Sequence, residues 1–290
     1  MIRIITTFCL LSLLFISCKP FGKKEDPAVL LSELKDKTWY VVNYQPQNPG
    51  QTSNIADKIA NESANAARTG KGLLYNFFQD GQCSFAEGNQ YFSGTWVYEE
   101  TTKSVNCKIT SGNRSKNIEL NITAINPENM TADITENGVK GAIQTRTDKY
   151  VYQAPDHNPW HPENNKWRIK PENAESDKAL LLRFKNHIQH YITLLQAMVD
   201  NNGKTLSVVN SPSCIQIYNG GIGIRDTERI DKEWFDTFFN QADADKCLGI
   251  FENILRESPS YGKSSGSWVK DDLMVLKSIY AQILEKEKSI

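Results

Sequence analysis

Apolar and polar side chains alternate along a series of short segments between residues 38 and 153. In the segment 117–124, Ile118, Leu120 and Ile122 share one face, and polar residues occupy the other. Turn-forming pairs such as Asp80-Gly81 and Asn137-Gly138 separate the segments. Alternation with a period of two between tight turns predicts an antiparallel up-and-down meander with one buried face. The expected strands are 39–44, 73–78, 83–85, 91–98, 105–110, 117–124, 131–135 and 139–152. About eight strands are enough to curl such a sheet into a barrel.

Three motifs in this region resemble the lipocalin-like domains of Bacteroidota lipoproteins. They are residues 34–39 (LKDKTW), 77–81 (FFQDG) and 94–98 (GTWVY). In that family a tryptophan opens the first strand, an aromatic strand ends in an Asp-Gly turn, and a Gly-x-Trp strand follows. The resemblance covers residues 30–153 and implies a lipocalin-like barrel, which holds small apolar ligands in some members and is purely structural in many.

An aromatic set is expected on the inner face of these strands. If the barrel is open, these side chains line a pocket for an apolar ligand; if it is closed, they form the core, which we favour. The set comprises Trp39, Tyr75, Phe77, Phe85, Phe92, Trp96 and Tyr98. Between the first two strands, the alanine-rich segment 54–68 predicts a short helix, either a lid over the barrel or a plain insertion.

The first residues have the three-part form of a secretory leader. Arg3 precedes an apolar run from Ile4 to Ile16, which is too short to span a bilayer as a stable helix. Ser17-Cys18 at its end resembles the lipobox of bacterial lipoproteins. The resemblance implies that residues 1–17 are removed and that Cys18 carries three acyl chains, which hold the protein on a membrane. The alternative is an ordinary signal peptide with an incidental cysteine.

Residues 18–29 are expected to form a polar, lipidated tether to the membrane. The expected location is therefore the cell envelope, at the outer membrane, on its periplasmic side or at the cell surface. The choice between inner and outer membrane stays open at this point.

Four cysteines lie beyond the leader and the lipidation site. Cys83 and Cys107 fall on strands separated by one other strand, and strands two apart lie about 9.6 Å apart, beyond the ~7 Å Cα separation of a disulfide. We therefore predict two buried thiols at these positions. Whether Cys214 and Cys247 pair stays open.

Residues 154–172 combine prolines, tryptophans and histidines in a segment that predicts neither a regular helix nor a central strand. We interpret it as a connector docked between two domains, because large rings favour burial. Trp160, His161 and Trp167, together with Gly220 at a predicted hairpin tip, are alternatively an exposed interaction surface.

Residues 173–290 predict an α+β domain of helices packed on a small hairpin sheet. Apolar residues recur at helical spacing in 176–200, and further helices are expected at 231–240, 243–256 and 268–286. A strand is expected at 206–210. A hairpin is expected at 214–225, where Asn219-Gly220 suits a type I′ turn.

Composition and motifs argue against several function classes. The 33 basic and 34 acidic residues give no electrostatic footprint for nucleic acid. His157, His161, His187 and His190 lie near one another in sequence but lack the H-E-x-x-H form, so no metal or other cofactor is predicted. Residues 262–266 (GKSSG) match a nucleophile motif by letter but follow a turn-like run rather than a strand.

We therefore expect a non-enzymatic envelope lipoprotein that acts as a binding or interaction module with a protein partner. The first alternative is a carrier of a small hydrophobic ligand in the β domain, and the second is an envelope hydrolase without a recognisable motif.

Overall fold

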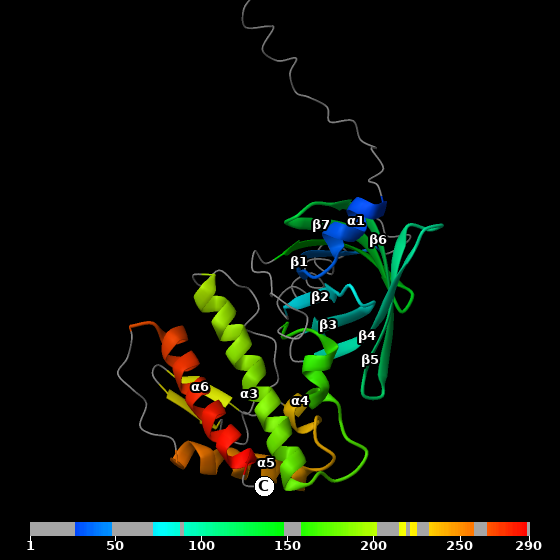
Figure 1. The fold of residues 1–290 in the computed structure, drawn as a ribbon. Helices are drawn as coiled ribbons and strands as arrows, with labels where there is room; N and C mark the ends of the chain where they lie inside the picture. The colour runs from blue at the N-terminus through cyan, green and yellow to red at the C-terminus, as the bar shows by residue number, and fades with distance from the viewer. Residues whose placement is uncertain are drawn as a thin grey trace, which may run out of the picture.

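The computed structural model describes residues 27–47, 72–87, 90–147, 158–201, 215–218, 221–224, 232–257 and 266–288. They form a closed eight-stranded antiparallel barrel, followed by a helical region that includes a two-stranded hairpin (Figure 1). The predicted order, a mainly β part followed by an α+β part, is confirmed.

The barrel is an up-and-down meander in which each strand pairs with the next and β8 closes on β1. Closure is direct: Tyr40 of β1 lies opposite Arg146 of β8, and Tyr44 lies opposite Ile143. Every segment expected as a strand contains one. The strands are β1 (Thr38–Pro46), β2 (Leu73–Phe77), β3 (Gln82–Glu87), β4 (Gln90–Glu99), β5 (Ser104–Ser111), β6 (Arg114–Ile125), β7 (Asn129–Glu136) and β8 (Val139–Thr147).

A short helix, α1 (Pro27–Leu34), packs against one end of the barrel (Figure 1). Leu30 and Leu34 are buried in the barrel core, and the Trp39 indole N–H donates to the Leu34 carbonyl over 3.0 Å. Sequence analysis assigned residues 27–29 to a polar tether, but they form the first turn of α1. Proline suits the first helical position, and the i, i+4 spacing of the two leucines gives the helix its buried face.

The inward aromatic side chains pack directly against one another. The ring centroids of Tyr75 and Phe85 lie 4.8 Å apart, those of Phe77 and Trp96 lie 5.7 Å apart, and those of Phe85 and Phe92 lie 5.8 Å apart. Of the aromatic set named from the sequence, Trp39, Tyr75, Phe77, Phe85, Phe92 and Trp96 are buried, and Tyr98 is partly buried against the same cluster. These contacts match the core interpretation of the set.

The barrel end opposite α1 carries a charged cluster over these rings. Lys116 Nζ pairs with Glu136 at 2.7 Å and Glu87 at 3.2 Å, and it lies 4.8 Å from the ring centroids of both Phe85 and Phe92. A half-buried ammonium group so surrounded by carboxylates and ring faces is well stabilised. Both ends of the aromatic core are therefore covered by side chains.

The cysteine prediction for the barrel is confirmed: Cys83 and Cys107 are free and buried. A hydrogen bond with Cys83 and burial both raise the pKa of Cys107. Cys247 is also a free buried thiol, and burial raises its pKa to about 12. Cys214 lies outside the described residues.

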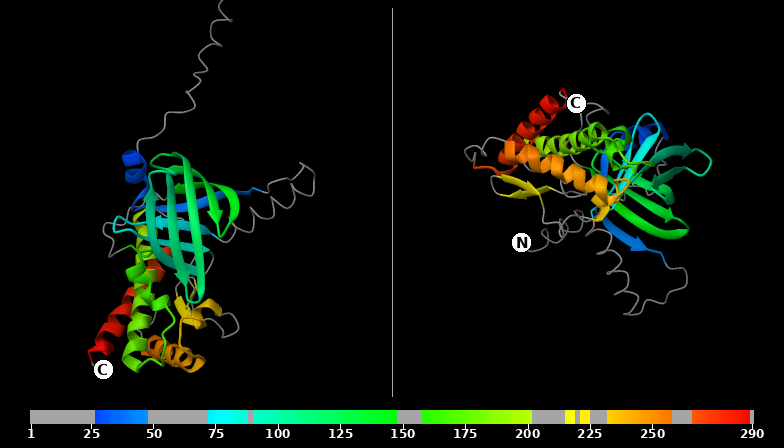
Figure 2. Two further views of the ribbon diagram at one scale, coloured as in Figure 1. Left: turned by 90° about the vertical axis from the view of Figure 1, so that its right-hand side faces the viewer. Right: turned by 90° about the horizontal axis from the view of Figure 1, so that it is seen from below.

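The helical region packs around the long helix α3 (Asp177–Asp200), whose N-cap Ser176 accepts a hydrogen bond from the Ala179 amide. The predicted helices at 243–256 and 268–286 correspond to α5 (Gln241–Glu257) and α6 (Trp268–Glu287). The hairpin pairs β9 (Ile215–Tyr218) with β10 (Gly221–Ile224), whereas its Asn219-Gly220 turn lies outside the described residues, as do segments 54–68 and 206–210. In Figure 2, the helices lie together on one side of the barrel.

The helix expected at 231–240 is shorter than predicted, because α4 covers only Lys232–Phe235. The Thr237 hydroxyl and amide both donate to the Trp234 carbonyl, which closes a tight turn in place of a continued helix. Within the residues described, no helix has both the length and the hydropathy needed to cross a bilayer.

Gly94 of β4 occupies a position that no side chain fits. A Cβ atom there would lie 1.9 Å from the Lys108 carbonyl oxygen on β5, which is backbone and cannot move aside. Gly94→Ala should lower the free energy of unfolding by about 3 kcal/mol or more, measured by urea denaturation. The control is Gly249→Ala in α5, where a Cβ meets nothing within 4 Å. That change should raise the free energy of unfolding by about 0.5–1 kcal/mol, and equal stability of the two variants would contradict this packing.

Candidate binding site at the junction of the barrel and the helical region

The segment 158–172 lies between the barrel and the helical region and contacts both. It contains the 3-10 helix η2 (Pro162–Arg168), a regular turn that sequence analysis did not expect there. Proline at its first position and His161 as its N-cap account for the turn, since that position needs no amide hydrogen. We call this region, with the barrel strands and α3 residues that it touches, the junction.

An apolar cluster holds the junction together. Trp160 has no exposed surface (0%) and packs between side chains of the outer barrel face and Leu194 of α3. Its carbonyl accepts a hydrogen bond from the Tyr91 hydroxyl over 2.9 Å. The cluster comprises Tyr40, Leu74, Phe78, Ala86, Tyr91, Trp160 and Leu194.

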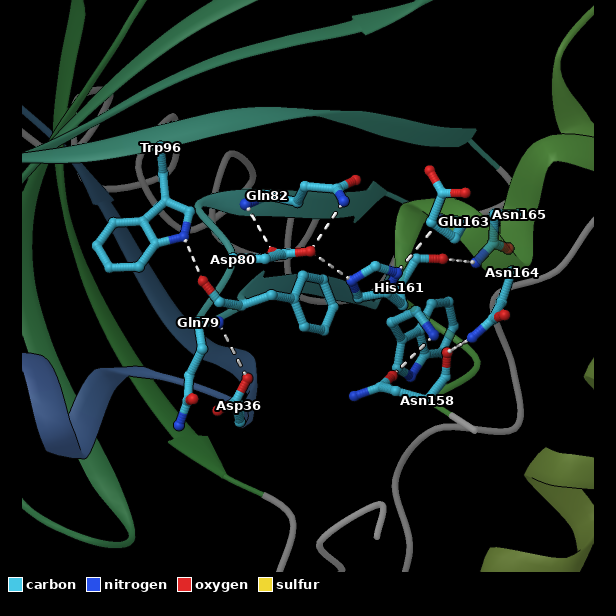
Figure 3. Close-up of polar contacts among 12 residues, drawn as sticks. Asp36, Gln79, Asp80, Gln82, Trp96, Asn158, His161, Glu163, Asn164 and Asn165 are labelled. Atoms are coloured by element: carbon cyan, nitrogen blue, oxygen red, sulfur yellow. Dashed lines mark hydrogen bonds and ion pairs between the residues drawn. The ribbon is translucent and has the colours of Figure 1, made fainter. Parts of the chain in front are cut away.

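His161 ties the junction to the β2–β3 turn (Figure 3). Its Nε2 lies 3.1 Å from Asp80 Oδ2, its Nδ1 accepts from the Glu163 amide, and its ring centroid lies 4.6 Å from that of Phe78. Because Nδ1 accepts, the proton belongs on Nε2, which donates to Asp80. Partial burial acts to raise the pKa of Asp80, but hydrogen bonds from Gln82 and His161 outweigh it and lower the pKa.

Arg168 lies in the middle of the junction. Its guanidinium carbon is 4.9 Å from the ring centroids of both Tyr91 and Trp167, and its Nη2 lies 3.2 Å from His190 Nε2. His187, one turn before His190 on α3, stacks on Trp167 with ring centroids 4.6 Å apart. Two tryptophans, two histidines and an arginine thus form one packed group.

Both histidines of α3 are neutral. Burial, with a smaller contribution from the Arg168 charge, lowers the pKa of His187 to about 3 and that of His190 well below its ordinary value. A neutral His190 can accept the hydrogen bond from Arg168. Burial also lowers the pKa of Arg168, to about 10, so that its guanidinium stays charged at neutral pH.

A cleft opens beside Arg168, at the barrel end opposite α1. Its volume is about 710 Å³, within the range typical of small-molecule sites. We call it the junction cleft. Its walls come from the start of β4, the β5–β6 turn, the end of the connector and the turn after α4: Gln90, Tyr91, Ser93, Thr110, Ser111, Gly112, Asn113, Arg114, Arg168, Ile169, Lys170, Pro171, Glu172, Asp236 and Thr237.

Arg183 of α3 fixes the connector wall of the cleft. It donates to Glu175 from Nε over 2.8 Å and from Nη2 over 3.0 Å, and to the carbonyl groups of Trp167 and Ile169. The Glu175 amide in turn donates to Asp243 of α5 over 3.0 Å. The backbone that carries Arg168 and Lys170 is therefore tied to two helices.

The residues named from the sequence fall in different places. Trp160, His161 and Trp167 are buried, which matches docking of the connector rather than an exposed interaction surface. Gly220 and the lipidation site Cys18 lie outside the described residues. Over the part of the chain that the structure describes, no three His, Cys, Asp or Glu side chains come together as a metal site.

Sequence reasoning missed the junction cleft. The one signal that could have pointed to it is the charged run Arg168-Ile169-Lys170 at the end of an otherwise aromatic connector. Its other wall is an ordinary Ser111-Gly112-Asn113 turn, recognised as a turn and nothing more.

Comparison with protein-family models gives no match, and comparison with curated protein sequences gives none either. Among solved structures, the chain is similar to a DUF4847 family protein from Bacteroides vulgatus, with 18% sequence identity. The similarity covers 42% of this chain and 99% of that chain, with a TM-score of 0.28. A likeness this distant carries no conclusion about function.

Proposed function

We propose that the protein is a non-enzymatic binding protein of the bacterial cell envelope, anchored through a lipid on Cys18, whose ligand occupies the junction cleft. The observation that carries this proposal is the cleft itself, about 710 Å³ with walls from both the barrel and the connector. Hydroxyl, amide and charged groups line it, and such groups bind polar molecules. A protein partner, expected from the sequence, stays a prediction.

The alternative, a carrier of a hydrophobic ligand inside the barrel, has less support. The inward rings contact one another, α1 packs on one end, and the Lys116 ion pairs lie over the other. An apolar ligand would have to displace these contacts. The hydrolase alternative gains no supporting constellation from the cleft, whose lining residues are suited to holding a ligand.

The anchor and the cleft are compatible in geometry. Cys18 and Pro27 are nine positions apart (27 − 18 = 9), and a fully extended chain of that length reaches about 30 Å. A lipid on Cys18 therefore keeps the α1 end of the barrel near the membrane. The junction cleft, at the opposite end, then faces the aqueous side and is accessible to a water-soluble ligand.

A variant that blocks the cleft tests this function. Thr110 is an exposed residue of β5 in the cleft wall, and Thr95 is an exposed residue of β4 outside it. The mature chain from residue 19, purified gently from its host's envelope, should carry an extra mass in native mass spectrometry. Thr110→Trp should lose that mass and Thr95→Trp should keep it. An apolar mass retained by both variants would support the barrel carrier instead.

The anchor is tested by substitution of the lipidated cysteine. In the host, Cys18→Ser should move the protein from the detergent-extracted membrane fraction to the soluble envelope fraction, because the acyl chains supply the membrane affinity. Cys9→Ser, within the same leader, is the control and should stay in the membrane fraction. Membrane association of Cys18→Ser equal to that of the unmodified sequence would refute lipid anchoring.

A further inference from the structure

We infer that the junction cleft selects a small polar ligand with a single carboxylate and several hydroxyl groups, such as a sugar acid, and that Arg168 and Arg114 hold the carboxylate. The inference rests on the proposed function and names the ligand class of the same site.

Arg168 is prepared for an in-plane partner. The rings of Tyr91 and Trp167 lie against its guanidinium, each 4.9 Å from the guanidinium carbon, and His190 fixes Nη2. Stacking of this kind uses the faces of the guanidinium plane and directs hydrogen bonding along its edges. A carboxylate matches such an edge in shape and charge, and an arginine whose orientation is already fixed loses little entropy on binding it.

Arg114 and Lys170 add positive charge from the two walls. Arg114 begins β6 at the tip of the barrel, with its guanidinium carbon 5.7 Å from the Phe92 ring centroid, and Lys170 is an exposed residue of the connector. Together with Arg168 they converge on one volume from segments more than fifty residues apart in sequence (168 − 114 = 54). An anion between them is attracted from both sides.

The acidic residues of the cleft set an upper limit on ligand charge. Glu172 and Asp236 are exposed, whereas Arg168 is the most buried of the charged lining residues. Charges interact more strongly in a buried environment than in water, so Arg168 dominates the field felt by a bound ligand. The two carboxylates disfavour a polyanion such as a polyphosphate. A single negative charge fits this balance.

The neutral lining residues suit hydroxyl groups. Gln90, Ser93 and Thr110 line the barrel wall, and Ser111 and Asn113 line the β5–β6 turn. These side chains both donate and accept hydrogen bonds, as sugar hydroxyls do. The carboxylate and the hydroxyls of one sugar acid therefore find complementary groups in the same cleft.

A matched pair of sugars tests the inference. D-glucuronate and D-glucose differ in one carboxylate, and each is titrated into the ¹⁵N-labelled mature chain from residue 19 at low salt. D-glucuronate should give saturable shifts of amide signals at residues 90–93, 110–114 and 168–172. D-glucose should bind at least ten times more weakly. Added salt should weaken D-glucuronate binding, because screening reduces the attraction between charges.

Three variants assign the carboxylate contact. Arg114→Gln, at an exposed position, should weaken D-glucuronate binding at least threefold. Lys108→Gln, which removes an exposed cation of β5 outside the cleft, should leave it unchanged. Arg168→Lys keeps the charge but not the fork and should weaken binding at least tenfold, with a spectrum as well dispersed as that of the parent chain.

Equal affinity for both sugars, equal effects of Arg114→Gln and Lys108→Gln, or no saturable shift with either sugar would each overturn the inference. None of these results decides whether the cleft is the binding site, which the native masses of Thr110→Trp and Thr95→Trp decide separately.

Discussion

Replacement of Trp160 with alanine is expected to lower the free energy of unfolding by about 3–5 kcal/mol, the usual cost of removing a fully buried tryptophan. Trp160 has no exposed surface (0%) and contacts both the outer barrel face and α3. Its loss should therefore also uncouple the barrel from the helical region. Urea denaturation followed by far-ultraviolet circular dichroism and by tryptophan fluorescence would measure both effects.

The matched control for this experiment is Val97→Ala. Val97 lies on the barrel with 60% of its surface exposed, and exposed positions usually change stability by less than about 0.5 kcal/mol. In Trp160→Ala the two spectroscopic transitions should separate, whereas in the control they should stay together. A loss below about 1 kcal/mol in Trp160→Ala would mean that the docked connector contributes little to stability.

Mild acid is expected to destabilise the protein through the two buried histidines. In the unfolded chain their pKa is about 6.5, whereas in the folded protein that of His187 is about 3 and that of His190 is also strongly lowered. The unfolded state therefore binds more protons between these values. Stability is complete above pH ~6.5 and falls as the pH decreases toward 3, by up to about 1.4 kcal/mol per pH unit for each histidine.

His187→Phe isolates this contribution. Phenylalanine can keep the stack on Trp167, and His187 Nε2 makes no hydrogen bond within the described part of the chain, so the change removes titration at little other cost. Urea denaturation between pH 4 and 8 should give a pH slope smaller by about one proton in the variant. Identical slopes in the two proteins would show that His187 is not buried in neutral form.

The barrel could be predicted from the sequence because its signal is local. Alternation such as Ile118, Leu120 and Ile122 fixes which face of a strand is buried, and Asp-Gly and Asn-Gly pairs mark the turns. Helix α1 escaped notice because its eight residues are too short to show clear periodicity, and its N-terminal proline was taken as the end of a tether. The shortening of α4 depends on one side chain, Thr237, which closes a turn on Trp234.

The site was only partly predictable. Burial of Trp160 and Trp167 follows from the tendency of large rings to leave water, so that docking of the connector was expected. The junction cleft depends on the approach of the Ser111–Arg114 turn to Lys170, and nothing in either segment indicates the other. The environment of Arg168 likewise combines Tyr91, Trp167 and His190 from three separate elements.

The most direct test of the central claim, that the junction cleft holds the ligand, is photo-crosslinking in the host envelope. Benzoylphenylalanine would replace Thr110 in the cleft wall or, as the control, Thr95 on the neighbouring strand. After irradiation, the intact mass of the protein labelled at position 110 should show a discrete adduct, and the protein labelled at position 95 should show none. Adducts of equal yield at both positions, or none at position 110 while a bound mass is still released on denaturation, would contradict the claim.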